Sequence, residues 1–332
     1  MREPASTVRI LETNLSDHVA AKAWRRLTGE AVRLDSIQVL KEERNHSQVY
    51  KLCGIGPGGT NIVAKRCSLE AATVEEVIYQ KILPNLPLTA LRCHGLTSDE
   101  DCELGWLFLE DAGEERYLSW HEDHRRIAGR WLSALHSSTI PAVAAASLPE
   151  RGSRYYLEEL RSVADVVLNS LDRPAFSADD RTMLRSIVSD CSRLEAHWEH
   201  VQRFCDSIPM TLVHGDMVAK NLRVRNGPDG NRLLVLDWEM AGWGIPAADL
   251  NELDPDRITY WSVVGSRWSS LDLADLQGLM QLGELFRLIT ALVWTTWGVD
   301  SSQWYLQQIR SYRSRLAAWT RAEKFEFLAG LA

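Results

Sequence analysis

Extended and helical sequence patterns are segregated along this chain, and their order is the feature that most limits its fold. Apolar runs rich in strand-forming residues occupy the first third, at 49–55, 61–67, 91–97 and 104–110. The first two runs flank the turn cluster GPGGT and predict a β-hairpin. One helical pattern, at 69–83, lies between the two pairs of runs and stops at Pro84.

Helical patterns dominate from about residue 121 onward. The spacing of apolar residues predicts helices over 123–137, 156–167, 180–204, 276–297 and 304–319. Strands followed by helices favour an α+β fold with segregated layers over a repeating βαβ sheet. We expect an N-terminal lobe over 1–112, made of antiparallel strands and one helix, and a mainly helical C-terminal lobe over 113–332.

The composition of the 332 residues argues against several classes of binding partner. The formal net charge of −8 argues against nucleic acid, because binding to phosphates needs clustered Lys and Arg. The six cysteines form no C-x-x-C pair, so we expect free thiols and no zinc site. The longest apolar stretch, Leu288–Trp297, is too short to span a bilayer, and no apolar signal segment is visible. We therefore expect a cytoplasmic monomer or homodimer without a membrane partner.

One segment, LVHGDMVAKNLRVRNGPDGNRLLVLDWE (212–239), places polar residues at the ends of apolar runs. The NGPDG turn predicts a hairpin, so the loop that enters its first strand lies next to the end of its second strand. That loop carries Asp216 and Asn221, and the second strand ends at Asp237. Two carboxylates and an amide oxygen are expected to converge there, a set that suits Mg²⁺. The alternative is that these residues only cap turns or face solvent.

Two motifs in this region resemble a known family. HGDMVAKN (214–221) resembles the H-G-D-x-x-x-x-N catalytic loop of aminoglycoside phosphotransferase-like kinases, a group that includes choline, homoserine and related small-molecule kinases. LDWEMAGWGIPAADL (236–250) resembles the D-W-E-x-A-G-W-G-x-P-x-x-D-L segment of the same family. The resemblance implies a protein-kinase-like two-lobed fold, ATP or GTP with Mg²⁺ as cofactors, and a small-molecule hydroxyl as the phosphate acceptor.

The resemblance also implies a role for each matching residue. Asp216 would be catalytic, by orienting the acceptor hydroxyl or accepting its proton, whereas Asn221 and Asp237 would hold Mg²⁺ at the nucleotide phosphates. His214 and Asp249 would hydrogen-bond the catalytic loop. These roles agree with the chemistry, since phosphoryl transfer depends mainly on positioning and charge stabilisation.

The nucleotide phosphates also need a cation, and Lys65 in the run NIVAKRC resembles the strand lysine of kinases. We expect Glu76 on the following helix to be its carboxylate partner, with Glu75 as the alternative. Without the downstream motifs, an exposed strand lysine and a solvated helix glutamate would be the simpler interpretation.

The run LFLEDAG resembles the hinge strand of these kinases, which places the adenine near Glu110 to Ala112. The same run also fits an ordinary core strand, and both interpretations can hold. The turn expected to cover the nucleotide, at 42–50, contains no glycine and so departs from the protein-kinase pattern. Asn45 and Ser47 are the candidates for phosphate contact in this turn.

Acceptor binding has no local motif. Glu239 and Trp243 lie near the expected metal ligands in the sequence, while Glu252 and Asp254 either line a pocket for a cationic substrate or form an ordinary solvated cluster. An aminoglycoside or related antibiotic, with resistance as the consequence, is the leading acceptor class; choline, homoserine or a sugar is the alternative. A non-catalytic nucleotide-binding regulatory module is the alternative of another class, although such modules usually lack one of the key residues.

Overall fold

The computed structural model describes residues 9–31, 33–42, 47–99, 103–141, 145–228, 230–299, 302–321, 324 and 330. The chain divides into two compact units: unit 1 is Met1–Leu118 with Ala219–Ala241, and unit 2 is Ser119–Val218 with Gly242–Ala332. The second segment of unit 1 contacts the first at several points, among them an antiparallel bridge between Arg116 and Arg223 and the ion pair of Glu110 with Arg225. The lobe boundary after residue 112 stays a prediction.

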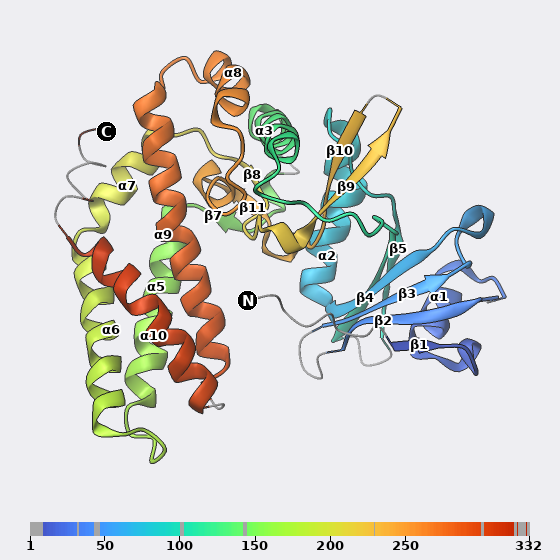
Figure 1. The fold of residues 1–332 in the computed structure, drawn as a ribbon, viewed down its shortest axis with the longest axis horizontal. Coiled ribbons are helices and arrows are strands. Elements are labelled where there is room, and N and C mark those ends of the chain that lie inside the picture. Colours follow the sequence, from blue (N-terminus) through green and yellow to red (C-terminus); the bar gives the residue numbers. More distant parts are fainter. Residues whose placement is uncertain are drawn as a thin grey trace. The chain divides into compact units, whose positions relative to one another are not determined.

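Unit 1 contains a six-stranded antiparallel sheet with the strand order β1-β2-β3-β4-β6-β5 (Figure 1). Its strands are β1 (Arg9–Leu11), β2 (Ser36–Glu42), β3 (Gln48–Cys53), β4 (Ile62–Ser68), β5 (Cys93–Ser98) and β6 (Leu104–Glu110). β3 pairs with β4, and β5 pairs with β6, which confirms the predicted hairpin and the two further strands. The first two strands have no counterpart in the sequence predictions.

Helix α1 (Val19–Thr28), which the sequence predictions also lack, covers one face of this sheet. Side chains alternate along β4, so Ile62 and Ala64 join the core under α1 while Val63 and Lys65 line a pocket on the other face. One face is therefore filled with apolar side chains and the other can hold a ligand. The core under α1 also contains Ala20, Ala23, Trp24, Ile37, Tyr50, Leu52, Trp106 and Phe108.

Helix α2 (Leu69–Val77) follows β4 directly and begins at Ser68, whose hydroxyl accepts a hydrogen bond from the N–H of Ala71. A π-helical turn (Ile78–Ile82) and a 3₁₀ turn (Leu83–Asn85) continue it. The predicted helix over 69–83 is therefore present, but its last turns are wider and then tighter than an α-helix.

The second segment of unit 1 forms the predicted hairpin of β9 (Leu222–Gly227) and β10 (Gly230–Val235). Leu222 lies opposite Val235, and the N–H of Leu236 donates to the carbonyl of Asn221 over 2.8 Å. Short 3₁₀ turns flank the strands at Ala219–Asn221 and Trp238–Met240. The hairpin thus brings the backbones around Asn221 and Asp237 together, as the antiparallel pairing predicts.

Unit 2 is mainly helical. Its long helices are α3 (Glu122–Ser137), α5 (Ser153–Ser170), α6 (Ala178–Ala196), α7 (Trp198–Ser207), α8 (Arg257–Arg267), α9 (Leu273–Trp297) and α10 (Ser302–Trp319). The helix predicted over 180–204 is two helices, because the backbone leaves the helical conformation at His197. Helix α8 is absent from the sequence predictions. Across the described helices, none has the run of apolar residues that crossing a lipid bilayer requires.

A small sheet in unit 2 joins β7 (Glu150–Arg151), β8 (Thr211–Val213) and β11 (Gly242–Gly244), with β11 in the middle. The two glycines of β11 lie directly against β7, where a Cβ atom would collide with the carbonyl oxygens of Pro149 and Arg151. The G-W-G part of the sequence motif is therefore a packing requirement of this sheet.

Candidate active site

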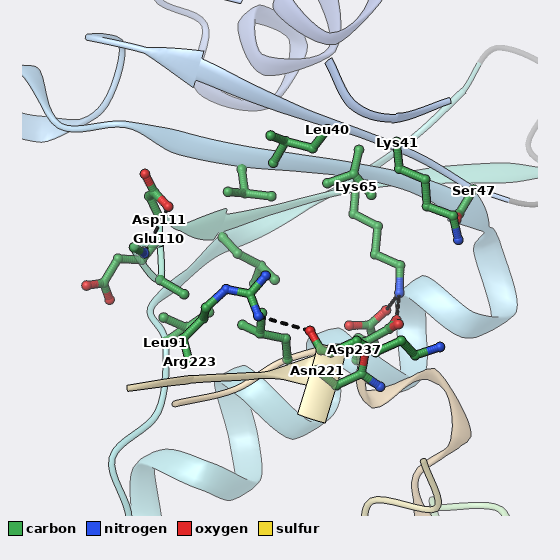
Figure 2. A pocket seen from close by; sticks show the side chains of 18 residues that line it. Leu40, Lys41, Ser47, Lys65, Leu91, Glu110, Asp111, Asn221, Arg223 and Asp237 are labelled. Carbon is green, nitrogen blue, oxygen red and sulfur yellow. Dashed lines mark hydrogen bonds and ion pairs between the residues drawn. The ribbon is translucent and has the colours of Figure 1, made fainter. Parts of the chain in front are cut away.

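Lys65 is the centre of a charged cluster in unit 1. Its Nζ lies 2.6 Å from Oε1 of Glu75 and 3.2 Å from Oε2 of Glu239, and it also contacts Oδ1 of Asp237. Figure 2 shows Lys65 reaching from the sheet toward Asp237. Glu75 is fully buried and Lys65 is 7% exposed, so their pairing is an interaction of the interior.

The carboxylate partner of Lys65 is Glu75, so the expectation of Glu76 is wrong and the alternative holds. The reason is the orientation of α2. Its buried positions are Ala72 and Glu75, and Tyr79 follows one turn later, whereas Glu76 is partly exposed. Adjacent residues of a helix differ in direction by about 100°, so only one of the two glutamates can lie on the buried face with Ala72.

Burial and neighbouring charges perturb this cluster strongly. Burial raises the pKa of Glu75 to about 7, against the charge of Lys65, which lowers it. Burial also disfavours the ammonium of Lys65, but the carboxylates of Glu75, Asp237 and Glu239 raise its pKa well above the usual value. Lys65 is therefore charged at neutral pH and available to anionic phosphate oxygens.

The residues around Lys65 fit a divalent cation. Ligand oxygens of Glu75, Asp237 and Glu239 lie within 4.8 Å of one another, and Asn221 lines the same pocket. Three carboxylates around a single ammonium leave negative charge in excess. Carboxylate and amide oxygens are the donors that Mg²⁺ takes in proteins. Asp237 has a φ of 66°, a conformation that is uncommon for a residue other than glycine and is typical of functional sites.

A cavity of about 290 Å³ in unit 1 joins this cluster to the predicted hinge. Most residues that the sequence predicts for the nucleotide and the metal line it: Ser47, Lys65, Glu110, Ala112, Asn221 and Asp237. Glu76 is not among the lining residues, and Asn45 lies outside the described residues. The structure therefore places the strand lysine, the hinge segment and the hairpin residues around a shared cavity.

The side chains of the hinge are already engaged. The carboxylate of Glu110 lies 2.6 Å from Nη1 of Arg225, and the carboxylate of Asp111 lies 2.9 Å from Nζ of Lys51. Nη2 of Arg225 also donates to the carbonyl of Asp111 over 2.9 Å. The carboxylates of Glu110 and Asp111 are therefore occupied by cations of unit 1.

The first part of the HGDMVAKN segment, up to Val218, belongs to unit 2 and follows β8. Asp249 is 1% exposed and accepts hydrogen bonds from the N–H groups of His214 (2.8 Å) and Gly215 (2.9 Å). The imidazole of His136 lies 3.2 Å from the same carboxylate. Nδ1 of His214 accepts from the N–H of Asp216 over 3.2 Å. The predicted hydrogen-bonding roles of Asp249 and His214 are confirmed.

Asp216 is buried and has an arginine partner that the sequence analysis missed. Oδ1 of Asp216 lies 3.2 Å from Nη1 of Arg287 on α9, and Nε of Arg287 lies 2.8 Å from Oε1 of Glu252. The guanidinium also lies over the ring of Trp294, 5.0 Å from its centroid. Seventy-one positions separate Asp216 from Arg287, so no local pattern indicates the pair.

The four residues expected at the acceptor each have different surroundings within their own unit. Glu239 belongs to unit 1 and contacts Lys65, while Glu252 pairs with Arg287 in unit 2. Asp254 pairs with Arg125 over 3.1 Å. Trp243 lines a different hollow of unit 2, together with His136, Thr211, Arg267 and Trp268. Their roles at an acceptor stay predictions.

Replacing Asp249 with asparagine tests the support of the catalytic loop. Each oxygen of the buried carboxylate accepts a backbone N–H, so an amide group would point its NH₂ at one of these donors. We expect the free energy of unfolding to fall by about 1–3 kcal/mol in chemical denaturation. Asp123→Asn is the control, because Asp123 is exposed and only pairs with Arg126 along α3. Equal losses in both variants would contradict the interpretation.

Comparisons with known proteins agree with this geometry. A family model described as the phosphotransferase enzyme family (APH) matches residues 55–278, about two thirds of the chain. No curated protein matches the sequence. Among solved structures, the GDP and kanamycin complex of APH(2")-IIia has a TM-score of 0.63 at 14% identity, covering 90% of this chain and 97% of that chain.

Two further solved structures are similar over most of their lengths. The complex of spectinomycin phosphotransferase, APH(9)-Ia, with ADP and spectinomycin has a TM-score of 0.54 at 10% identity, covering 90% of each chain. Plasmodium vivax ethanolamine kinase has a TM-score of 0.57 at 12% identity, covering 92% of this chain and 86% of that chain. These likenesses confirm the protein-kinase-like α+β fold predicted from the sequence. The family model, which matches well over half of the sequence, shows that the chain belongs to the phosphotransferase enzyme family (APH).

Proposed function

We propose that the protein transfers the γ-phosphate of ATP or GTP to a hydroxyl group of a small molecule. The observation that carries this proposal is the ion pair of Lys65 with the buried Glu75 in a cavity that Asn221 and Asp237 also line. Phosphoryl transfer asks a protein to position phosphates and to neutralise their charge, and this arrangement supplies both.

On the nucleotide side, Lys65 binds the α- and β-phosphates while Glu75 fixes its side chain. Asn221 and Asp237 hold Mg²⁺, which when bound neutralises charge on the phosphates. The base lies along the hinge at 110–112, and Ser47 contributes a hydroxyl at the opposite edge of the cavity. The support is that each of these residues lines one cavity of unit 1.

On the acceptor side, Asp216 orients the substrate hydroxyl and accepts its proton. The hydrogen bonds of Asp249 to the loop hold the backbone that carries Asp216. The carboxylate of Asp216 is buried and pairs with Arg287, so its position is well defined. A non-catalytic binding module would have no need for this arrangement, which favours an enzyme.

An aminoglycoside or related antibiotic is the leading acceptor class, since two of the similar structures contain kanamycin and spectinomycin. One observation favours the metabolic alternative, which includes choline, homoserine and sugars. Glu252 and Asp254 each pair with an arginine of unit 2, which partly neutralises their negative charge. Their electrostatic attraction for a polycationic antibiotic is therefore weaker. The cytoplasmic location and the monomeric or homodimeric state stay predictions.

A screen of nucleotide turnover tests the proposal. Purified protein with Mg²⁺ and ATP or GTP is offered aminoglycosides, macrolides, amino alcohols and sugars, and release of the diphosphate is followed by a coupled assay. We expect at least one acceptor to raise release above the acceptor-free rate, and the Asp216→Asn protein to lose that increase. Nucleotide binding without transfer to any acceptor would instead favour the regulatory module.

A further inference from the structure

Arg223 lines the nucleotide cavity and has no role in the proposed chemistry so far. It lies on β9, two residues after Asn221, and its Nη1 donates to the carbonyls of Lys220 (2.9 Å) and Leu222 (2.8 Å). Within the described part of the chain, no carboxylate lies within ion-pair distance of its guanidinium. Arg225 on the same strand differs, because it pairs with Glu110.

The position of Arg223 in the cavity points to the base and not to the phosphates. In Figure 2 its guanidinium lies between the hinge residues Glu110 and Asp111 on one side and Asp237 with Lys65 on the other. Its backbone bridges to Arg116, just beyond the hinge. Burial and the charge of Arg116 both lower the pKa of Arg223. The phosphate end of the cavity already has its own cation.

The cavity that Arg223 lines also has apolar side chains on its wall. Leu40, Val49 and Val63 come from β2, β3 and β4, and Figure 2 places Leu40 across the cavity from Arg223. Two backbone carbonyls accept hydrogen bonds from Nη1 of Arg223, and the charge of Asp111 raises the pKa of Arg223 against the effect of burial. A guanidinium is planar, weakly hydrated and stacks well on aromatic rings. An aromatic ring inserted between Arg223 and Leu40 would therefore stack on the guanidinium with one face and pack against an apolar side chain with the other.

We propose that Arg223 is the floor of the base site, with its guanidinium plane stacked on the purine ring of the nucleotide and the aliphatic side chains of β2–β4 on the other face. This inference rests on the proposed function, because it takes the ligand of the cavity to be a purine nucleotide. Stacking on a flat cation does not distinguish adenine from guanine, so this contact by itself does not select between ATP and GTP.

Binding measurements with and without a base test the inference and need no acceptor. Dissociation constants for ADP, GDP and inorganic tripolyphosphate are measured by calorimetry in Mg²⁺ for the wild type, Arg223→Lys and Arg223→Gln. We expect both variants to weaken ADP and GDP about fivefold, the size of a partly desolvated cation–π contact. Tripolyphosphate, which has no base, should bind all three proteins within about twofold of one another. Arg232→Lys, at an exposed position of β10 in the same hairpin, is the matched control and should change nothing.

The other outcomes each overturn the inference. Equal weakening of ADP and tripolyphosphate would mean that Arg223 contacts phosphate. Unchanged affinities with a lower melting temperature would mean that it only satisfies the carbonyls of Lys220 and Leu222. A wild-type protein that binds neither ADP nor GDP would overturn the proposed function itself, whereas ADP binding that Arg223 does not influence would overturn this inference alone.

Discussion

Replacing Asp216 with asparagine is expected to lower the turnover number for phosphate transfer by about 10²–10⁴-fold. Asparagine keeps the size and shape of the side chain but cannot accept the proton of the acceptor hydroxyl. The residues proposed to bind the nucleotide belong to unit 1, while Asp216 belongs to unit 2, so the affinity for ADP should stay the same. The measurements are the turnover number with the acceptor found in the screen and the dissociation constant of ADP.

The control for this prediction is the fold of the variant. Asp216 pairs with Arg287, which keeps Glu252 as a partner, so the melting temperature should change little. Arg287→Lys is a second control for the loss of turnover. It alters the same ion pair but leaves the carboxylate of Asp216 in place. A tenfold loss of rate corresponds to an increase of about 1.4 kcal/mol in the activation free energy. A turnover number of the Asp216→Asn protein above one tenth of the wild-type value would exclude a catalytic role for this carboxylate.

Replacing Lys65 with methionine is expected to lower the free energy of unfolding by about 3–5 kcal/mol, because it leaves the fully buried Glu75 without its cation. The double variant Lys65→Met with Glu75→Gln should recover most of this loss, since no buried charge remains. Both variants should lose affinity for ADP. Chemical denaturation and calorimetry separate the two effects, and a single variant as stable as the wild type would contradict the buried pair.

The same variant should become less stable as the pH rises. Burial already raises the pKa of Glu75 from 4.5 to about 7, and removing the charge of Lys65 raises it further. A carboxyl group with a raised pKa in the folded state favours folding only while it is protonated, so the stability of Lys65→Met should fall continuously from about pH 4.5 to above pH 7. The double variant should lack this slope.

Lys51→Met is the matched control for Lys65→Met. Lys51 is also a buried lysine of the same sheet with a carboxylate partner, Asp111. Asp111 is less buried and keeps hydrogen bonds from Asn61 and from the N–H of Gly113, so its charge stays satisfied. We therefore expect a clearly smaller loss of stability for Lys51→Met, and equal losses would show that any lysine of this sheet matters as much as Lys65.

The sequence predicts the elements that have a strong local pattern. The order of strands and helices and the hairpin around the NGPDG turn follow from short runs of residues. The support of the loop at His214 and Gly215 by Asp249 is expected from the family resemblance. The first strands and α1 escape prediction because their apolar residues are few and pack mainly on other strands.

The rest of the site depends on long-range pairing. Glu75 and Glu76 are adjacent in sequence, and only the packing of α2 on the sheet decides which of them meets Lys65. Arg287 has the sequence context of an ordinary exposed arginine, and its partner Asp216 lies 71 positions away in the chain. Such contacts carry no periodicity, so a single sequence does not reveal them.

Gly242 and Gly244 pack directly against β7. The motif that contains them therefore combines residues needed for packing with residues needed for the proposed chemistry. The glycines are required for the packing of the backbone, whereas Asp237, a few residues before them, belongs to the proposed chemistry. On the proposed function, a relative that kept the glycines but had lost Asp237 would retain the architecture and lose phosphate transfer. In proteins of this type, different residues of the same motif should therefore be used to predict the fold and to predict phosphate-transfer activity.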